Sequence, residues 1–295
     1  MMKPIPNSEH PIEHLSTASQ QLTLFPDLET GSDFEAANAN VDTGNDDEIE
    51  TPILRQLDLF PRSRYMGSKQ AILPFIYRYT QPLVFTTALD AFSGSGSVSY
   101  LFKAMGKSVT SNDFMRFCYH TAHACIANSQ IQLDLPTVEH ILSPHPNPDT
   151  VIQDTFDGLY FTREENKLLD SMAAQIRELD APFQKSIAYA AIAWACLRRR
   201  PRGLFTYTGM RYDDGRRDLQ TSLIDHFRNA VQTFNQAVFE TEQGCVSYNL
   251  NVSELPPDLA FDLVYLDPPY VSPYSDNDYT RRYHFVEGLV RYWDG

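Results

Sequence analysis

Residues 261–270, Phe-Asp-Leu-Val-Tyr-Leu-Asp-Pro-Pro-Tyr, constrain the fold more than any other stretch of this chain. The apolar run at 263–266 contains β-branched and aromatic side chains, which predicts a short buried strand. Two consecutive prolines cannot continue a strand ladder, because each lacks the N–H group and has a fixed φ angle. The strand therefore ends in a rigid turn that carries four candidate site residues: Asp267, Pro268, Pro269 and Tyr270. Ligands of open α/β sheets bind at the carboxyl ends of strands, so this turn is the predicted reaction site.

The chemistry of the turn suits an exocyclic amino group on a nucleobase. Such a nitrogen is a poor nucleophile, because its lone pair is delocalised into the ring. Asp267 and the carbonyl of Pro268 can both accept its hydrogens, which leaves the lone pair free to attack a methyl group. Tyr270 can stack on the base. The alternative is a Pro-Pro loop that follows a strand and binds nothing.

A glycine-rich loop follows a second predicted buried strand at residues 84–92. The loop reads Asp90-Ala91-Phe92-Ser93-Gly94-Ser95-Gly96 and leads into a helix that ends near residue 105. Its glycines let the backbone approach a ligand closely. Asp113 follows the next predicted strand, 108–111, and lies 21 residues after Phe92. An acid at that distance can reach a ribose hydroxyl, which predicts a nucleoside cofactor.

Position 99 distinguishes between two kinds of nucleoside cofactor. A dinucleotide-binding loop would have a third glycine there, and this chain has Ser99. A cofactor without a pyrophosphate fits better, and S-adenosylmethionine is the candidate. A tight turn without a ligand remains the alternative.

The segment 64–69, Arg-Tyr-Met-Gly-Ser-Lys, precedes a predicted helix at 70–79. The apolar side chains of this helix fall on one face: Ile72, Phe75, Ile76 and Tyr79. A Gly-Ser turn at a helix N-terminus exposes free N–H groups, and Lys69 adds positive charge. The segment is a candidate site for a carboxylate or phosphate, and an ordinary capped helix is the alternative.

The other periodic segments predict helices at 117–127, 163–179, 182–197, 219–239 and 281–293, a loop at 133–150 and a strand at 245–248. The first of these helices carries two cysteines and two histidines, Cys118, His120, His123 and Cys125. The cysteines share one helix face and the histidines are offset from it. A packed helix is therefore favoured over a zinc site.

Seven arginines fall within residues 198–217, among aromatic and loop-forming residues. Arginine binds phosphates and is the best bidentate reader of guanine, so the segment is predicted to bind nucleic acid. A solvated basic face is the alternative.

Acidic residues are concentrated at the N-terminus. Residues 1–62 carry 3 Lys+Arg and 12 Asp+Glu, a net charge of 3 − 12 = −9, out of −14 for the chain. Together with their Asn, Ser, Thr and Pro content, this predicts a disordered acidic tail over 1–62. The chain has no apolar run of membrane-spanning length, no secretory signal and no CxxC pair, which favours a cytoplasmic protein.

The order of these motifs resembles that of the bacterial adenine-specific DNA methyltransferases of the GATC-methylase type. The motifs are, in order, the segment 64–69, the glycine loop, the Asn-Asp pair at 112–113, the arginine-rich insert and Asp-Pro-Pro-Tyr. The resemblance spans about residues 64–293. It implies an α/β, Rossmann-like, S-adenosylmethionine-dependent core and methyl transfer to a flipped-out adenine in double-stranded DNA. The implied core comprises residues 63–130 and 243–295, and residues 131–242 are the implied, mostly helical DNA-recognition insert.

The resemblance also implies roles for single residues. The cofactor would be bound by Tyr65, Gly67, Lys69, Asp90, Phe92, Gly94, Gly96 and Asp113. DNA would be contacted by a hairpin that contains Arg202, Phe205, Arg211 and Tyr212. No metal ion is implied.

Two departures from the family pattern stand out. The family usually has an acid between the third and fourth strands that meets the adenine amine of the cofactor, and Asn251 or Asn249 is the nearest candidate here. The expected sheet also needs about three more strands after the last helix, so a fragment is expected. Three alternatives stay open: a cytosine-N4 methyltransferase, an RNA adenine methyltransferase, or a non-catalytic remnant that binds DNA or a clamp.

Two near-identical pentapeptides lie in the predicted tail, Gln21-Leu22-Thr23-Leu24-Phe25 and Gln56-Leu57-Asp58-Leu59-Phe60. Both resemble the short motif by which bacterial proteins bind the replication sliding clamp. The resemblance implies that the tail tethers the protein to the clamp. For the second copy, packing of its apolar side chains onto the folded domain is the alternative.

Overall fold

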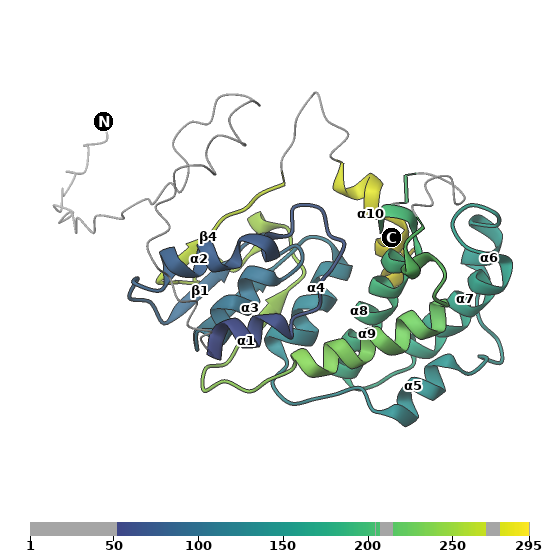
Figure 1. Ribbon diagram of the computed structural model, residues 1–295, viewed down its shortest axis with the longest axis horizontal. Coiled ribbons are helices and arrows are strands. Elements are labelled where there is room, and N and C mark those ends of the chain that lie inside the picture. Colours follow the sequence, from purple (N-terminus) through teal and green to yellow (C-terminus); the bar gives the residue numbers. More distant parts are fainter. Residues whose placement is uncertain (1–51, 204, 207–214, 270–277, 295) are drawn as a thin grey trace, which may run out of the picture. The chain divides into compact units, whose positions relative to one another are not determined.

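We describe the fold from a computed structural model that covers residues 52–203, 205–206, 215–269 and 278–294 (Figure 1). Four short parallel strands form one sheet in the order β3-β2-β1-β4. They are β1 (Thr87–Asp90), β2 (Ser108–Asn112), β3 (Val246–Tyr248) and β4 (Leu263–Tyr265). The fold is therefore of the parallel α/β class, as the sequence predicts, and all four predicted strands are present.

The central pair of strands brings the predicted site segments together. Asp90, the last residue of β1, pairs with Ser111 of β2 on one side and with Tyr265 of β4 on the other. Parallel strands end at the same edge of a sheet. The glycine loop after β1 and the Asp-Pro-Pro turn after β4 are thus neighbours, although about 170 residues separate them in the chain.

The burial of two predicted strands differs from expectation. The strand predicted at 263–266 is present as β4, but its predicted burial is wrong, because Val264 and Leu266 are exposed. Among the described strands β4 is an edge strand, with β1 on one side only. Val84, predicted to begin a buried strand at 84–92, is fully exposed, and β1 begins at Thr87.

One helix packs on the sheet, and a second helix packs on the first. Helix α3 (Ser97–Ala104) follows the glycine loop and packs against β1 and β2. Helix α2 (Leu73–Thr80), which follows the 3-10 helix η2 (Lys69–Ile72), packs against α3. The predicted apolar face of the 70–79 helix is only partly correct. Leu73 and Ile76 are buried, while Ile72, Phe75 and Tyr79 are exposed.

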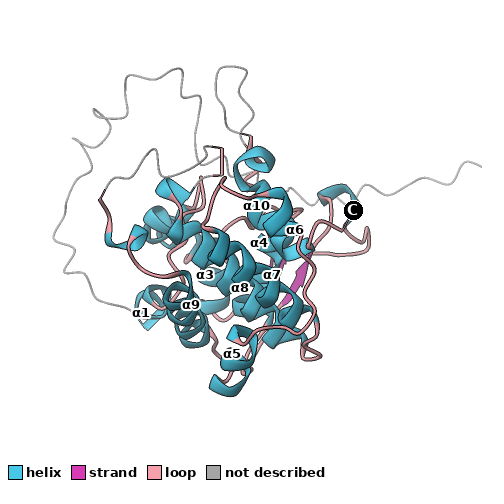
Figure 2. Cartoon of the chain, turned by 90° about the vertical axis from the view of Figure 1, so that its right-hand side faces the viewer, coloured by secondary structure: helices cyan, strands magenta, loops and turns pink. Residues whose placement is uncertain are grey.

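The chain between β2 and β3 is helical, and helices dominate the view in Figure 2. It contains α4 (Arg116–Ala122), the π-helix η3 (His123–Ala127), α5 (Leu135–Leu142), α6 (Val151–Thr155), α7 (Arg163–Arg177), α8 (Pro182–Arg199) and α9 (Leu223–Ala237), with short 3-10 turns η4 (Pro201–Gly203) and η5 (Arg217–Leu219). A further 3-10 turn, η6 (Val252–Glu254), follows β3. Helices α8 and α9 pack side by side (Figure 1).

Local sequence explains where several of these helices begin. Thr162 and Glu165 form a reciprocal capping box at the start of α7, and Ser222 caps α9. The prediction of a loop at 133–150 is wrong in its first half. Asp134 accepts a hydrogen bond from the Thr137 N–H and begins α5, which buries Val138 and Ile141.

The last described helix, α10 (Tyr279–Arg291), follows the Asp-Pro-Pro turn in the chain and belongs to the helical region. It packs against α4 and α8. Phe285 of α10 lies in an aromatic cluster with side chains from the helical region: Phe156, Tyr160, Phe161 and Phe205. The sheet and the helices thus share one hydrophobic core, and the predicted division at residues 131 and 242 stays a prediction.

The second pentapeptide is part of this core. Helix α1 (Pro52–Asp58) buries Leu57. Phe60, two residues after the end of this helix, is buried against Tyr100 of α3, with ring centroids 4.5 Å apart. The side-chain amide of Gln56 donates to the Tyr100 hydroxyl at 2.7 Å. The predicted disordered tail of 1–62 is therefore wrong for residues 52–62. The first pentapeptide, at 21–25, lies outside the described residues.

Neither a metal cluster nor a membrane-spanning helix occurs in the part of the chain that the structure describes. The two histidines considered for a metal instead share a buried serine. His120 Nδ1 lies 3.1 Å and His123 Nδ1 lies 2.8 Å from the Ser186 hydroxyl. Burial lowers the pKa of both histidines, that of His120 to about 3.

Candidate functional site

A cavity of about 580 Å³ opens at the carboxyl ends of the strands. Its lining comes from segments within 65–69, 90–97, 112–115, 250–252, 265–269 and 278–280. Most of the residues that the sequence predicts for the site line this cavity: Tyr65, Gly67, Lys69, Asp90, Phe92, Gly94, Asp113, Asn251, Asp267, Pro268 and Pro269. Gly96 lies in the same loop but not in the lining, and Tyr270 lies outside the described residues.

The glycine loop is held in place by Asp113. One carboxylate oxygen accepts the Gly94 N–H at 2.7 Å, and the other accepts the Met115 N–H at 2.8 Å. Burial raises the pKa of Asp113 to about 6, because the two backbone hydrogen bonds offset only part of the cost of a buried charge. Asp113 therefore positions the loop, in addition to the cofactor contact predicted from the sequence.

Two glycines of the loop have left-handed backbones and close neighbours. Gly94 has φ +50°, and a Cβ atom there would lie 2.8 Å from Cε1 of Tyr65. Gly96 has φ +79°, and its Cβ would lie 3.4 Å from the ring of Phe60. Only glycine combines this conformation with such close approach at position 94.

Asp90 is a buried carboxylate with spare hydrogen-bonding capacity. Its Oδ2 accepts from the Ser99 hydroxyl at 2.6 Å, and its Oδ1 has no hydrogen-bond partner among the described residues. Burial, and to a lesser extent the charges of Asp113 and Asp267, raises the pKa of Asp90 to about 7. A buried acceptor without a donor is costly, so this oxygen is suited to a ligand that brings a donor or a positive charge. Ser99, which argued against a dinucleotide, supports Asp90 here.

Asp267 forms an ion pair with Lys69 across the cavity. Both side chains are largely buried, and the ammonium of Lys69 also donates to the carbonyl oxygen of Gly67 at 3.2 Å. The pair links the segment before α2 to the Asp-Pro-Pro turn. The resemblance implied a cofactor contact for Lys69, and the structure adds this contact with the candidate catalytic carboxylate.

Tyr65 is fixed by aromatic residues of α10. Its ring stacks on that of Tyr283, with centroids 5.2 Å apart and an interplanar angle of 11°. The Tyr283 hydroxyl accepts the Met66 N–H at 2.6 Å. Burial raises the pKa of the Tyr65 phenol far above its ordinary value, so the ring is neutral.

The two candidate asparagines near β3 have different places. Asn251 lines the cavity and caps the short turn η6, where its side-chain oxygen accepts the Ser253 N–H at 3.1 Å. Asn249 lies behind the strand end, and its amide donates to the carbonyls of Asp113 and Phe114, both at 2.9 Å. Of the two, Asn251 is the residue that a ligand in the cavity can reach.

Sequence reasoning assigned no role to several apolar and aromatic residues of the lining, among them Phe114, Met66 and Tyr279. Phe114, which is 60% exposed, projects beside Asp113, and Met66 and Tyr279 lie near Tyr65. An exposed aromatic ring directly after an acid at a strand end is the pattern that would have identified Phe114. Such a ring can stack on a flat heterocycle.

Several residues of the arginine-rich segment are structural. Arg198 pairs with Asp218, Arg199 with Glu165. Arg200 is buried and donates to the Tyr160 carbonyl at 3.0 Å. The prediction that all seven arginines form one basic surface is therefore wrong for these three. Arg202, Arg216 and Arg217 are exposed.

The predicted DNA contact at Phe205 is wrong. The ring is 1% exposed and stacks on Phe285 of α10, with centroids 4.8 Å apart. A buried ring has no face left for a base. Arg211 and Tyr212, the other predicted members of the hairpin, lie outside the described residues.

The amino-acid sequence that forms this cavity matches a known protein family. The profile of the D12 class N6 adenine-specific DNA methyltransferases aligns with residues 65–291. The chain belongs to this family of DNA adenine methyltransferases. The matched region includes the cavity segments from Tyr65 onwards and ends in α10.

Three individual methyltransferases and methylases are also similar to this chain. The chain is 32% identical over 244 residues to the type II methyltransferase M2.HphI of Haemophilus parahaemolyticus, with 78% of this chain and 71% of that protein aligned. It is 25% identical to modification methylase LlaI of Lactococcus lactis subsp. lactis, with 78% of this chain and 38% of that protein aligned. It is 24% identical to the type II methyltransferase M.NlaIII of Neisseria lactamica, with 70% of this chain and 60% of that protein aligned. The alignment thus spans less than two thirds of the last two proteins.

Proposed function

We propose that this D12-class enzyme transfers a methyl group from S-adenosylmethionine to the N6 amino group of an adenine in double-stranded DNA. The observation that carries the proposal is one cavity with Asp267 on its wall and the glycine loop beside it. The proposed architecture is a Rossmann-like core with a helical DNA-recognition insert between β2 and β3.

The cavity fits S-adenosylmethionine. Asp90 offers a buried carboxylate oxygen without a partner among the described residues, which suits the cationic amino group of the methionine part. Phe114 offers an exposed ring for the adenine part, and Asn251 lies within the same lining. When bound, the cofactor supplies an electrophilic methyl group. Its proposed partners are Tyr65, Gly67, Lys69, Asp90, Phe92, Gly94, Gly96, Asp113 and Asn251.

Asp267 has the central role in the proposed chemistry. An ionised carboxylate accepts a hydrogen bond from the adenine amino group, and the carbonyl of Pro268 can accept the other amino hydrogen. Both interactions direct the nitrogen lone pair away from the acceptors. Lys69 holds the carboxylate in place before the base arrives, because the two side chains are paired. Tyr270, outside the described residues, is proposed to stack on the base, which must leave the duplex to reach the cavity.

Product analysis tests this function. The chain is incubated with methyl-labelled S-adenosylmethionine and plasmid DNA, and the DNA is digested to nucleosides. We expect the label in N6-methyl-2′-deoxyadenosine from double-stranded DNA. Label in N4-methyl-2′-deoxycytidine, or only in RNA substrates, would support the two enzymatic alternatives. S-adenosylhomocysteine binding without any transfer would support a non-catalytic remnant.

DNA is proposed to bind at the exposed part of the arginine-rich segment. Arg202 is exposed and has an unusual left-handed backbone, with φ +57°, and Arg216 and Arg217 are also exposed. Arg211 and Tyr212 complete the proposed surface. Phe205 is excluded from it by its burial.

Replacing Arg202 and Arg211 together by alanine is expected to weaken binding to plasmid DNA and to flatten its salt dependence. Each lost phosphate contact lowers the slope of log K against log salt by about 1, so the expected change is about 2. Binding titrations between low and moderate salt measure it. Arg228→Ala, an exposed arginine paired with Glu139 elsewhere, is the matched control. An unchanged slope in the double variant would show that DNA binds to another surface.

The names of the relatives suggest a setting for the enzyme. M2.HphI and M.NlaIII are called type II methyltransferases, and LlaI is called a modification methylase. We propose that this chain likewise protects DNA in a restriction-modification system. The test is whether DNA from cells that express it resists a restriction enzyme whose site it methylates.

Clamp tethering is proposed for the first pentapeptide only. In the second copy Leu57 and Phe60 are buried, so they are not available to a partner unless α1 detaches. A peptide of residues 18–28 is expected to bind the purified sliding clamp with micromolar affinity, about −8 kcal/mol. In the full chain, Leu24→Ala with Phe25→Ala should abolish clamp binding without affecting stability. Leu57→Ala with Phe60→Ala should lower stability and leave clamp binding unchanged. Retained clamp binding by the first double variant would refute the tether.

A further inference from the structure

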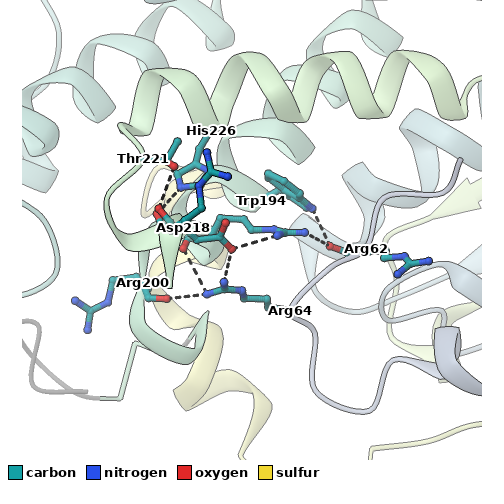
Figure 3. A network of polar contacts seen from close by, with 9 residues as sticks. Arg62, Arg64, Trp194, Arg200, Asp218, Thr221 and His226 are labelled. Atoms are coloured by element: carbon teal, nitrogen blue, oxygen red, sulfur yellow. Dashed lines mark hydrogen bonds and ion pairs between the residues drawn. The ribbon is translucent and has the colours of Figure 1, made fainter. Parts of the chain in front are cut away.

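Arg64 lies between the cofactor cavity and the arginine-rich segment. The residues that follow it, from Tyr65 onwards, line the cavity. Its own side chain points to the other side, where its guanidinium forms an ion pair with Asp218 (Figure 3). The same guanidinium donates to the backbone carbonyl of Arg200 at 3.1 Å and to that of Arg198 at 3.4 Å. One side chain thus contacts the beginning and the end of the segment 198–218.

Asp218 is shared by two arginines. Arg198 Nη1 donates to the same carboxylate oxygen at 3.2 Å, and His226 Nε2 donates to the backbone carbonyl of Asp218 at 2.7 Å. Burial alone would raise the pKa of Asp218, but the hydrogen bond from Arg198 and the charges of both arginines hold it below its ordinary value. The ionised carboxylate joins Arg64 to Arg198 of α8, and the backbone carbonyl of Asp218 anchors the end of the segment to α9.

The backbone two residues before Arg64 is also held by hydrogen bonds. The backbone carbonyl of Arg62 accepts from the Trp194 indole at 3.2 Å and from Arg198 Nη2 at 3.1 Å, both on α8 (Figure 3). The Arg62 side chain itself is 76% exposed. The backbone of 62–64 is thus fixed to the end of α8, where the arginine-rich segment begins.

The turn that exposes Arg202 rests on the stem of Arg64. Gly203 has φ +67°, and a Cβ atom there would lie 2.9 Å from Cβ and 3.2 Å from Cδ of Arg64. Arg202, immediately before it, also has a positive φ. Two successive left-handed residues are disfavoured unless the surroundings hold them. The contacts of Arg64 with Gly203 and with the Arg200 carbonyl are such surroundings.

We propose that Arg64 is a positioning residue that fixes the Arg202 turn relative to the cofactor cavity, so that DNA binding and cofactor binding favour each other. The inference rests on the proposed DNA contact of Arg202 and deepens it. DNA that orders the turn also orders Arg64 and, through the backbone, Tyr65 and the segment up to Lys69. By linkage, a cofactor that orders this segment improves DNA binding by the same factor.

Arg64→Lys tests the coupling. A lysine keeps the positive charge, but its ammonium lacks the planar fork that bridges a carboxylate and two carbonyls. The affinity for S-adenosylhomocysteine, which cannot react, is measured by calorimetry with and without plasmid DNA. In the unaltered chain we expect DNA to raise this affinity about fivefold or more, and in Arg64→Lys less than about twofold. Without DNA the two proteins should bind S-adenosylhomocysteine with similar affinity.

Two further variants keep the test independent of a simple loss of folding. Gly203→Ala places a methyl group against the aliphatic part of the Arg64 side chain and displaces the turn without altering a charge. This variant should also lose the coupling between DNA binding and S-adenosylhomocysteine binding. Arg62→Lys makes the matched change at an exposed neighbouring arginine and should retain the coupling. Thermal unfolding is recorded for all variants. If Arg64→Lys does not fold, Gly203→Ala decides the result.

A double-mutant cycle separates this inference from the proposed function. If Arg64 acts through Arg202, then Arg64→Lys should weaken DNA binding when Arg202 is present. The same substitution should have little further effect on DNA binding in a chain that already carries Arg202→Ala. Additive losses, or a coupling that Arg64→Lys and Gly203→Ala retain, would overturn the inference alone. If Arg202→Ala leaves DNA affinity unchanged, the proposed DNA surface is wrong and the inference fails with it.

Discussion

Replacing Asp267 by asparagine is expected to lower the rate constant for methyl transfer by about 10³-fold while cofactor affinity changes by less than about threefold. Asparagine keeps the shape of the side chain but not its charge, so it accepts the adenine amino hydrogen more weakly. Its amide also presents a donor where the substrate needs an acceptor. The loss should appear in kcat, because the interaction strengthens as the amine becomes a nucleophile. Single-turnover methylation of plasmid DNA and calorimetric binding of S-adenosylhomocysteine give the two quantities.

Asp262→Asn is the matched control for this prediction. Asp262 lies just before the start of β4, whereas Asp267 follows its end. Asp262 accepts the backbone N–H groups of Thr86 and Thr87 at 2.8 and 2.9 Å, outside the cavity lining. We expect a small loss of stability and normal methyl transfer. Methyl transfer by Asp267→Asn within about tenfold of the unaltered chain would remove Asp267 from the catalytic role.

Replacing Phe205 by alanine is expected to lower the free energy of unfolding by about 3–5 kcal/mol, the usual cost of removing a buried aromatic ring. The ring stacks on Phe285 and contacts Tyr160 edge-on, with centroids 5.2 Å apart. Truncation would leave a cavity between the arginine-rich segment and α10. Chemical denaturation monitored by circular dichroism measures the change.

Phe75→Ala provides the comparison, because the Phe75 ring is 42% exposed on α2. Its expected cost is below about 1 kcal/mol. The contrast tests burial against residue type. If Phe205→Ala left stability unchanged and weakened DNA binding instead, the ring would belong to the DNA surface that the sequence predicted.

Much of the site could be predicted because local patterns specify it. An Asp-Pro-Pro turn ends a strand wherever it lies, and glycines at 94 and 96 form a loop that other residues would strain. Asp113 also follows a strand. Parallel strands end at a common edge, so three separate local signals already implied one cavity.

The burial of the arginine-rich segment could not be predicted in the same way. Arg200 and Phe205 have the same neighbours in sequence as exposed Arg202, and composition treats all of them as one basic, aromatic stretch. Their burial depends on Tyr160 and on Phe285, which lie about 40 and 80 residues away. Contacts with such distant residues form only when the helices pack, so the local sequence does not determine them.

The sequence by itself determined the parallel α/β class, the family and the edge of the sheet at which the reaction is proposed, because each depends on short segments with their own conformational preferences. The tertiary structure alone decided which arginines are structural, that Leu57 and Phe60 pack into the core, and that β4 is exposed. It also revealed that Lys69 pairs with Asp267 and Arg64 with Asp218. A charged or aromatic side chain has the same local preferences in either role. Its partner, which lies far away in the chain, decides between them.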